Sequence, residues 1–236
     1  MTYISQDVDI LDKGELLGWV KDSIKTGTHL LNHGYQAHVY LYEGNGQKFI
    51  IKAPTGWGLG RLIRRAMLRR EYRIYSKLSG VNGVPRCYGL LEGSYLILEF
   101  IDGVQFQKAE IKDRSLFFKS FLQVIQDLHN AGVAHADLKK KDNLLVMDGQ
   151  TVYVIDFGAA IMKKRGFLPF SRYLYNLGRK FDFNAWVKLK YKGKFTNMEE
   201  DDIQYYNRTK VEKVFHWIKQ NYLKLKKSLT CQTLWL

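Results

Sequence analysis

The stretch His135-Ala-Asp-Leu-Lys139, followed by Asn143 and then by Asp156-Phe-Gly158, decides how this chain is interpreted. These residues supply two carboxylates, an amide oxygen and a cation within a short length of sequence. Transfer of a phosphoryl group needs such a set, because one carboxylate positions the attacking hydroxyl, other oxygens bind Mg²⁺ and a cation faces the phosphates. Each short motif occurs by chance in many chains, so the interpretation depends on matching residues upstream.

An upstream lysine and glutamate are predicted to form an ion pair. Lys52 ends an apolar run typical of a buried strand, and a buried ammonium must be paired or lose its proton. Glu71 follows on a helical pattern with Met67, Ile74 and Leu78, which places its carboxylate on the apolar face of the helix. We therefore expect the two to pair, although either alone could be a solvated surface charge.

In combination, these residues resemble the protein-kinase-like superfamily over residues 31–158. The resemblance implies a two-lobed α+β fold, with a small antiparallel sheet in the first lobe and a reduced, mainly helical second lobe. It also implies that Lys52 holds the phosphates of ATP while it pairs with Glu71. We expect the lobes to span residues 1–98 and 99–236 and to act as one catalytic unit.

The resemblance assigns roles to the residues around the catalytic loop as well. Asp137 is expected to be the catalytic base or the residue that positions the hydroxyl, and Lys139 to be the cation facing the transferred group. Asn143 and Asp156 are expected to bind Mg²⁺, which prefers oxygen ligands. His135 is expected to be structural.

A phosphate-covering loop is expected over residues 32–39. Only Gly34 remains of the glycines found there in the family, because Asn32 and Ala37 take the other places. The backbone can therefore approach the phosphates less freely than a glycine-rich loop would allow. Gly34, Ala37 and Val39 are still expected to contact the nucleotide.

A hinge between the lobes is expected at residues 95–103. The segment has the apolar run of a buried strand and ends in Asp102-Gly103, a turn signal. The resemblance implies that Glu99 and Ile101 contact ATP there.

Local patterns also predict the elements that carry the catalytic loop. Apolar residues at helical spacing indicate a helix over residues 115–130, with Gly132 suited to the left-handed position after its end. Two apolar runs on either side of Asp148-Gly149 indicate a β-hairpin. Asn143 and Asp156 then stand at opposite ends of this hairpin, and we expect both to reach one metal site.

The spacing inside the catalytic loop departs from the family by one residue. The family places asparagine five residues after the aspartate, whereas that position here is Asp142 and Asn143 comes one later. The thirteen residues from Asn143 to Asp156 match the family, so we place the insertion within residues 139–142. Asp142 remains a rival ligand, or a solvated charge beside three lysines.

The second lobe is expected to be minimal. Many regulated protein kinases have an arginine at the position of Ala136, where it binds a phosphate on the activation loop. No Ala-Pro-Glu sequence follows Gly158, and 78 residues remain after it, fewer than the full set of substrate-binding helices requires.

Composition is compatible with this organisation. With 46% hydrophobic residues, a chain of 236 residues can bury a sizeable core. Cys87 and Cys231 are far apart and show no metal or redox spacing, and no leader or membrane span is evident. We therefore expect a cytoplasmic monomer, with a location at the inner face of the inner membrane as a refinement.

The net charge of +14 is unevenly distributed. Residues 61–80 carry seven Lys/Arg against Glu71 alone, and residues 161–236 carry seventeen against six acids. These two basic blocks favour an anionic partner such as a membrane surface over nucleic acid, with solvated helix faces as the alternative. Trp186 and Tyr191, interleaved with lysines, could join such a surface or belong to the core.

Three functions remain open from the sequence. The short second lobe, the helix around Glu71 and the His-Ala-Asp-Leu-Lys sequence are similar to the lipopolysaccharide core (Kdo/heptose) kinases, which implies an anionic glycolipid acceptor at the inner membrane. The Asp-Leu-Lys order and the intact Asp-Phe-Gly also resemble Ser/Thr protein kinases and small atypical kinases, which implies a protein acceptor. A third reading, favoured by the depleted glycine loop, is a pseudokinase that binds nucleotide and docks a partner.

Overall fold

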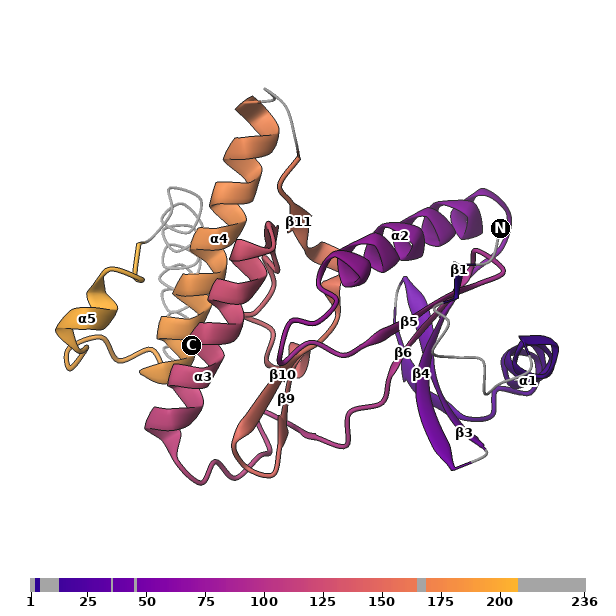
Figure 1. Ribbon diagram of the computed structural model, residues 1–236, viewed down its shortest axis with the longest axis horizontal. Helices are drawn as coiled ribbons and strands as arrows, with labels where there is room; N and C mark the ends of the chain where they lie inside the picture. Colours follow the sequence, from indigo (N-terminus) through magenta and orange to yellow (C-terminus); the bar gives the residue numbers. More distant parts are fainter. Residues whose placement is uncertain (1–2, 5–12, 35, 45, 165–168, 208–236) are drawn as a thin grey trace, which may run out of the picture.

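The computed structural model describes residues 3–4, 13–34, 36–44, 46–164 and 169–207. These residues form a lobe built on a sheet and a second lobe that is mainly helical (Figure 1). The expected α+β, two-lobed, protein-kinase-like fold is thereby confirmed. The boundary at residues 98/99 falls near the end of the last long strand of the sheet and stays a prediction.

The first lobe is a six-stranded antiparallel sheet with one helix on each face. Its strand order is β1-β5-β6-β4-β3-β2. The bounds are β1 Tyr3–Ile4, α1 Lys13–Thr26, β2 Leu30–His33, β3 Ala37–Gly44, β4 Gln47–Pro54, α2 Gly58–Lys77, β5 Cys87–Leu91 and β6 Tyr95–Glu99.

Alternation along the strands explains why both faces of this sheet are covered. Ile97 of β6 points into a cluster with Leu16 and Val20 of α1, whereas its neighbours Leu96 and Leu98 point toward α2. Figure 1 shows α1 and α2 on opposite sides of the strands. Helix α1 was not predicted from the sequence.

The second lobe carries the catalytic loop between helices and short strands. Its elements are β7 Val104–Gln105, α3 Arg114–Asn130, β8 Val133–Ala134, the 3-10 turn η2 Lys141–Asn143, β9 Leu144–Met147, β10 Thr151–Val154, the 3-10 turn η3 Phe157–Ala159, β11 Ile161–Met162, α4 Pro169–Lys190 and α5 Glu200–Ile203. Among the described helices, none is both long and apolar enough to cross a lipid bilayer.

The predicted helix and hairpin are both present. Asp113 caps α3 by accepting a hydrogen bond from the Leu116 amide at 2.9 Å, and Gly132 takes a φ of 72° just beyond the helix. Asp148 and Gly149 both have positive φ in the three-residue connection between β9 and β10, where the Gln150 amide donates to the Met147 carbonyl at 3.1 Å.

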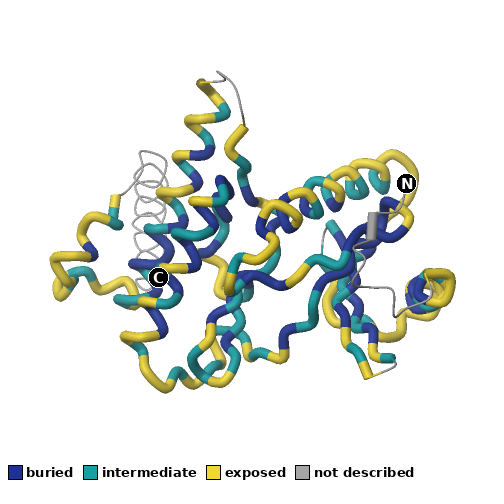
Figure 2. Tube along the Cα trace, viewed as in Figure 1, coloured by how far each residue is buried: buried dark blue, intermediate teal, exposed yellow. Residues whose placement is uncertain are grey.

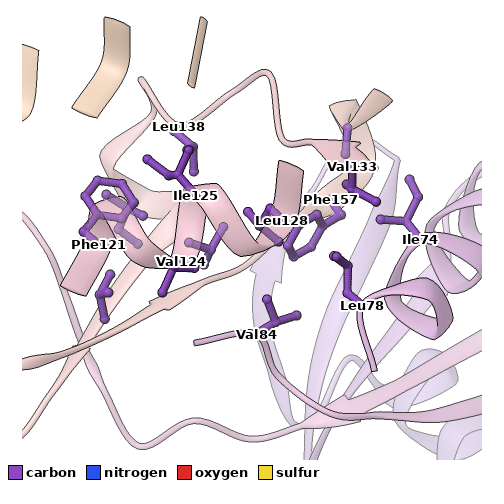
Figure 3. Packing of buried hydrophobic residues seen from close by; sticks show 14 of the residues in the cluster. Ile74, Leu78, Val84, Phe121, Val124, Ile125, Leu128, Val133, Leu138 and Phe157 are labelled. Atoms are coloured by element: carbon purple, nitrogen blue, oxygen red, sulfur yellow. The ribbon is translucent and has the colours of Figure 1, made fainter. Parts of the chain in front are cut away.

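One core cluster joins the two lobes. Figure 3 shows Leu78 and Val84, which follow α2, packed near Leu128 of α3 and Phe157 of η3. Leu78, Leu128 and Phe157 are almost completely buried. The lobes therefore share apolar contacts close to the catalytic loop.

Trp186, an aromatic residue of the second basic block, belongs to the core. Trp186 is 1% exposed and donates a hydrogen bond from Nε1 to the Phe118 carbonyl at 2.8 Å. Lys190 lies over its ring and pairs with Glu199 and Asp202 at 2.6 Å. Of the two readings of Trp186, the surface one is therefore wrong. Because Lys190 is paired with acids, the described part of this block presents less unpaired positive charge than the sequence indicates. Residues 208–236 of the block lie outside the described residues.

Candidate active site

Lys52 is the centre of the candidate site. It lies on β4 between Val39 of β3 and Leu96 of β6, so the sheet carries it into the interior. Its Nζ donates to Glu71 Oε1 at 2.6 Å and to Asp156 Oδ1 at 3.1 Å. The predicted pair with Glu71 is present, and Asp156 is a second partner.

Helix α2 brings Glu71 to this position on its buried face. The buried residues Leu68, Glu71 and Tyr75 follow helical spacing, and Ile74 is also buried. Met67, which the sequence pattern placed on this face, is only partly buried, so the predicted face was rotated slightly. The Glu71 side chain retains 4% exposure, so water cannot replace Lys52 as its partner.

Lys52 and Asp156 hold each other in their ionised forms. Burial alone would lower the pKa of the Lys52 ammonium, but Glu71 and Asp156 outweigh burial and raise it. Lys52 in turn holds the pKa of Asp156 below its usual range against the opposing effect of burial. The cluster therefore offers an ammonium and a free carboxylate oxygen side by side at neutral pH.

The catalytic loop places Asp137 and Asn143 next to each other. The Asn143 amide donates to the backbone carbonyl of Asp137 at 3.0 Å and to its Oδ2 at 3.3 Å. Asn143 is buried at the end of η2, while Asp142 is half-buried and accepts from Gln107 at 2.6 Å. Both Asn143 and Asp142 line the cleft, but Asn143 is the one fixed to Asp137.

His135 is packed rather than presented to the cleft. It is fully buried, its Nε2 lies 3.1 Å from the Ile155 carbonyl and its ring packs against Phe157. This placement agrees with the structural role expected from the sequence.

Asp182 of α4 is a residue that the sequence analysis missed. Its carboxylate accepts hydrogen bonds from the amides of His135 and Ala136 at 2.8 and 2.7 Å, and lies 2.9 Å from His129 Nε2. Ala136 has a φ of 65°, an unfavourable conformation for a residue with a side chain, and the Asp182 contacts hold the loop there. An acid on an otherwise apolar helix face was the available signal.

Arg70 was also misassigned. The sequence placed it in a basic block facing an anionic surface, but its guanidinium donates to the backbone carbonyls of Gly158, at 2.9 Å, and Ala160. The neighbouring Arg69 donates to the Gly93 carbonyl at 2.9 Å. Both guanidinium groups therefore fix loops of the protein, and Arg70 ties α2 to the turn that follows Asp156.

Two adjoining cavities surround this cluster. Lys52, Val39, Lys140 and Asp156 line both of them. The larger, of about 550 Å³, reaches the hinge, and the smaller, of about 290 Å³, lies beneath the loop at residues 34–39.

The predicted nucleotide-contacting residues divide between these cavities. Glu99 and Ile101 line the larger one, although the Glu99 side chain also accepts a hydrogen bond from the Arg86 amide at 2.9 Å. Gly34 and Ala37 line the smaller one together with Asp137. A Cβ on Gly34 would lie 2.4 Å from the Ala37 carbonyl oxygen, so the one retained glycine is required by the fold of the loop.

The position of Lys139 differs from the expectation. Both lysines are exposed, but Lys139 lines neither cavity, whereas Lys140 lines both and contributes to the lowered pKa of Asp156. The extra residue in the loop changes which lysine faces the cleft.

The donor set suits Mg²⁺ bound together with nucleotide. No group of three or more His, Cys, Asp or Glu in the described part of the chain is arranged to hold a metal alone. Mg²⁺ usually takes one or two protein oxygens and completes its octahedron with phosphate and water. Asp156 and Asn143, which line the same cavity, fit that requirement.

Fold and site together have the arrangement of a protein-kinase-like enzyme, with a cleft suited to ATP and Mg²⁺. A strand lysine is paired with a helix glutamate above a cleft, and an aspartate, an asparagine and the Asp-Phe-Gly aspartate lie around the same cleft.

Similarities to known proteins agree with this class. Residues 57–168 match the family described as RIO domain. The chain is 33% identical over 150 residues to a probable bifunctional tRNA threonylcarbamoyladenosine biosynthesis protein of Methanosarcina barkeri, covering 60% of this chain and 26% of the relative. It is 30% identical over 137 residues to casein kinase I homolog 1 of Schizosaccharomyces pombe, covering 50% and 29%. A third relative is the probable serine/threonine-protein kinase fnkB of Dictyostelium discoideum, 26% identical over 99 residues, covering 38% and 19%.

The chain thus spans less than a third of the length of each of these relatives. Their similarity supports the superfamily and the kinase class.

We predict that Asp182→Ala destabilises the protein and weakens catalysis together. Two buried backbone amides would lose their acceptor, which costs about 2–4 kcal/mol of unfolding free energy. Urea unfolding and ATP turnover measure the two effects. Asp127→Ala, which removes a carboxylate bound by Gln123 on α3, is the matched control and should cost less than about 1 kcal/mol. Equal losses in both variants would contradict the role of Asp182.

Proposed function

We propose that this chain is a minimal atypical Ser/Thr kinase, which transfers the γ-phosphoryl group of ATP to a hydroxyl of a protein acceptor. The observation that carries the proposal is the Lys52–Glu71–Asp156 cluster beside Asp137 and Asn143 at one cleft. Phosphoryl transfer depends mainly on positioning and on charge stabilisation, and this arrangement supplies both.

Each residue has a defined task in this proposal. Lys52 holds the α- and β-phosphates, and Glu71 fixes the direction of the Lys52 ammonium. Asp156 and Asn143 hold Mg²⁺, which when bound offsets negative charge on the β- and γ-phosphates. Asp137 accepts a hydrogen bond from the acceptor hydroxyl and orients it, while Lys140 faces the transferred group.

The similarities favour a protein acceptor over a glycolipid. Two of the relatives are named as kinases of the casein or serine/threonine-protein type, and the RIO domain match covers the catalytic loop. The lipopolysaccharide acceptor expected from the sequence, and the location at the inner membrane that goes with it, gain no support from these matches. A pseudokinase is disfavoured because the charged groups needed for transfer lie in working proximity.

Identification of the acceptor is the direct test. Purified protein with labelled ATP and Mg²⁺ is offered casein, a cell lysate and lipopolysaccharide core in separate reactions, with Asp137→Ala as the inactive control. We expect Asp137-dependent label on Ser or Thr of protein. Label on the lipopolysaccharide core alone would replace the protein acceptor by a glycolipid, and no label with slow or absent ATP hydrolysis would favour the pseudokinase.

Lys52→Ala and Asp156→Asn are each expected to lower kcat/KM by two or more orders of magnitude, because phosphate positioning and metal charge supply most of the catalysis. Lys48→Ala is the control. It lies on the same strand, but its pair with Glu43 is half-exposed, so its loss should leave turnover unchanged. Asp156→Asn should also raise the Mg²⁺ concentration needed for half-maximal rate. Wild-type turnover in either site variant, with the fold intact by circular dichroism, would refute the assignment.

The register of the inserted residue can be tested by a pair of variants. Asn143→Ala should impair use of Mg-ATP by about tenfold or more, because it removes a metal ligand and the contact to Asp137. Asp142→Ala should have a smaller effect, since it loses only the bond from Gln107. Steady-state kinetics over a Mg²⁺ series decide between them, and a larger loss at Asp142 would shift the metal ligand by one residue.

A second pair of variants separates the two candidate lysines. Lys140→Ala should lower kcat by about tenfold or more, since it removes the cation that lines both cavities. Lys139→Ala, an exposed neighbour, should have little effect on kcat. The opposite order would restore the assignment expected from the sequence.

A further inference from the structure

The first two turns of α2 expose apolar side chains that a soluble helix normally buries. Trp57, just before the helix, is 89% exposed, and Leu59, Leu62 and Ile63 are 74%, 58% and 55% exposed. Figure 2 shows α2 with a largely exposed end. We call Trp57, Leu59, Leu62 and Ile63 the apolar tip.

The apolar tip has its own face of the helix. Leu59, Leu62 and Ile63 follow i, i+3, i+4 spacing and share one side. The buried residues Leu68, Glu71 and Tyr75 follow a second such series on another side, which packs against the sheet and Lys52. Helix α2 therefore carries two apolar faces, and the core accounts for only one of them.

The stretch of sequence that carries the tip has only positive charges. No Asp or Glu occurs from residue 44 to residue 70, whereas Arg61, Arg64 and Arg65, each partly buried, alternate with the tip residues along the sequence. The first turn of α2 has no acidic residue, and Trp57 provides no side-chain hydrogen bond to the helix start. The amides of this turn lack intrahelical acceptors, so the end of the helix attracts negative charge as well.

We propose that the apolar tip docks the kinase onto an anionic membrane surface. Trp, Leu and Ile partition into the boundary between headgroups and acyl chains, while arginines bind lipid phosphates. Charge and apolarity occur together here, which suits a bilayer better than a purely acidic soluble partner or a second copy of this positively charged chain. The surface differs from the basic block expected from the sequence, because Arg69 and Arg70 are held by backbone carbonyls.

This inference goes beyond the proposed function and is independent of the acceptor. The tip lies on the helix that carries Glu71, yet on another face, so variants of the tip leave the residues of the cleft in place. Docking and phosphoryl transfer can therefore be measured and can fail separately.

Vesicle sedimentation tests the proposal. The purified chain of 236 residues is mixed with phosphatidylglycerol-containing vesicles or with pure phosphatidylcholine vesicles at low and at high salt. We expect binding to the anionic vesicles only, weakening as salt rises. Leu62→Gln/Ile63→Gln should weaken it by about tenfold or more, because the apolar contribution is lost.

The matched control is Leu116→Gln/Ile203→Gln. These residues are 49% and 53% exposed, similar to the tip, but they lie on α3 and α5. This variant should bind vesicles like wild type. ATP turnover with a soluble acceptor should be unchanged in both double variants, which separates failed docking from a failed kinase assignment.

Quenching by brominated lipid reports insertion directly. Wild-type tryptophan fluorescence should be quenched on anionic vesicles, and Trp57→Phe should lose most of that quenching while it still binds. Failure of the wild type to bind anionic vesicles at low salt would overturn the proposal, and so would equal binding by the tip variant. Self-association that depends on Leu62 and Ile63, without vesicle binding, would show that the apolar tip binds a second copy of the chain and not a membrane.

Discussion

The Lys52 ammonium lies in the interior, where a charge without partners would cost several kcal/mol. Glu71 on α2 and Asp156 after β10 are the partners of this ammonium, and they come from two different parts of the chain. Neither carboxylate is in place unless the sheet, α2 and the hairpin are assembled. The ion cluster thus links formation of the site to formation of the whole fold, and removal of Lys52 would leave Glu71 as a buried carboxylate without its ammonium partner.

Further polar contacts hold the surroundings of this cluster. Arg70 fastens the turn after Asp156 to α2, and Asp182 fastens the loop before Asp137 to α4. Both work through backbone groups. Because they bind main-chain atoms, they determine where the loops lie and leave the reactive side chains free for ligands. The left-handed conformations of Ala136 and Asp156 are maintained within this framework.

Local patterns were sufficient for the elements that carry the site. Residue spacing predicted the Lys52–Glu71 pair, α3 and the hairpin, because helical periodicity and turn chemistry act over a few residues. Asp182 and Arg70 depend on contacts between segments distant in the chain, so no local pattern could reveal their partners. For the lysine that faces the transferred group, the sequence indicates Lys139 and the cavity lining indicates Lys140, because one extra position in an irregular loop redirects its side chains.

Helix α1 has a consequence for how this protein can be dissected. The RIO domain match begins at residue 57, which excludes α1, β2, β3 and β4 together with Lys52. Trimming only α1 would uncover Tyr40, Phe49 and Ile97 on an antiparallel sheet, and such an apolar face invites aggregation. A fragment that retains the lysine and keeps this face covered therefore includes α1 and begins upstream of the first residue of the RIO domain match.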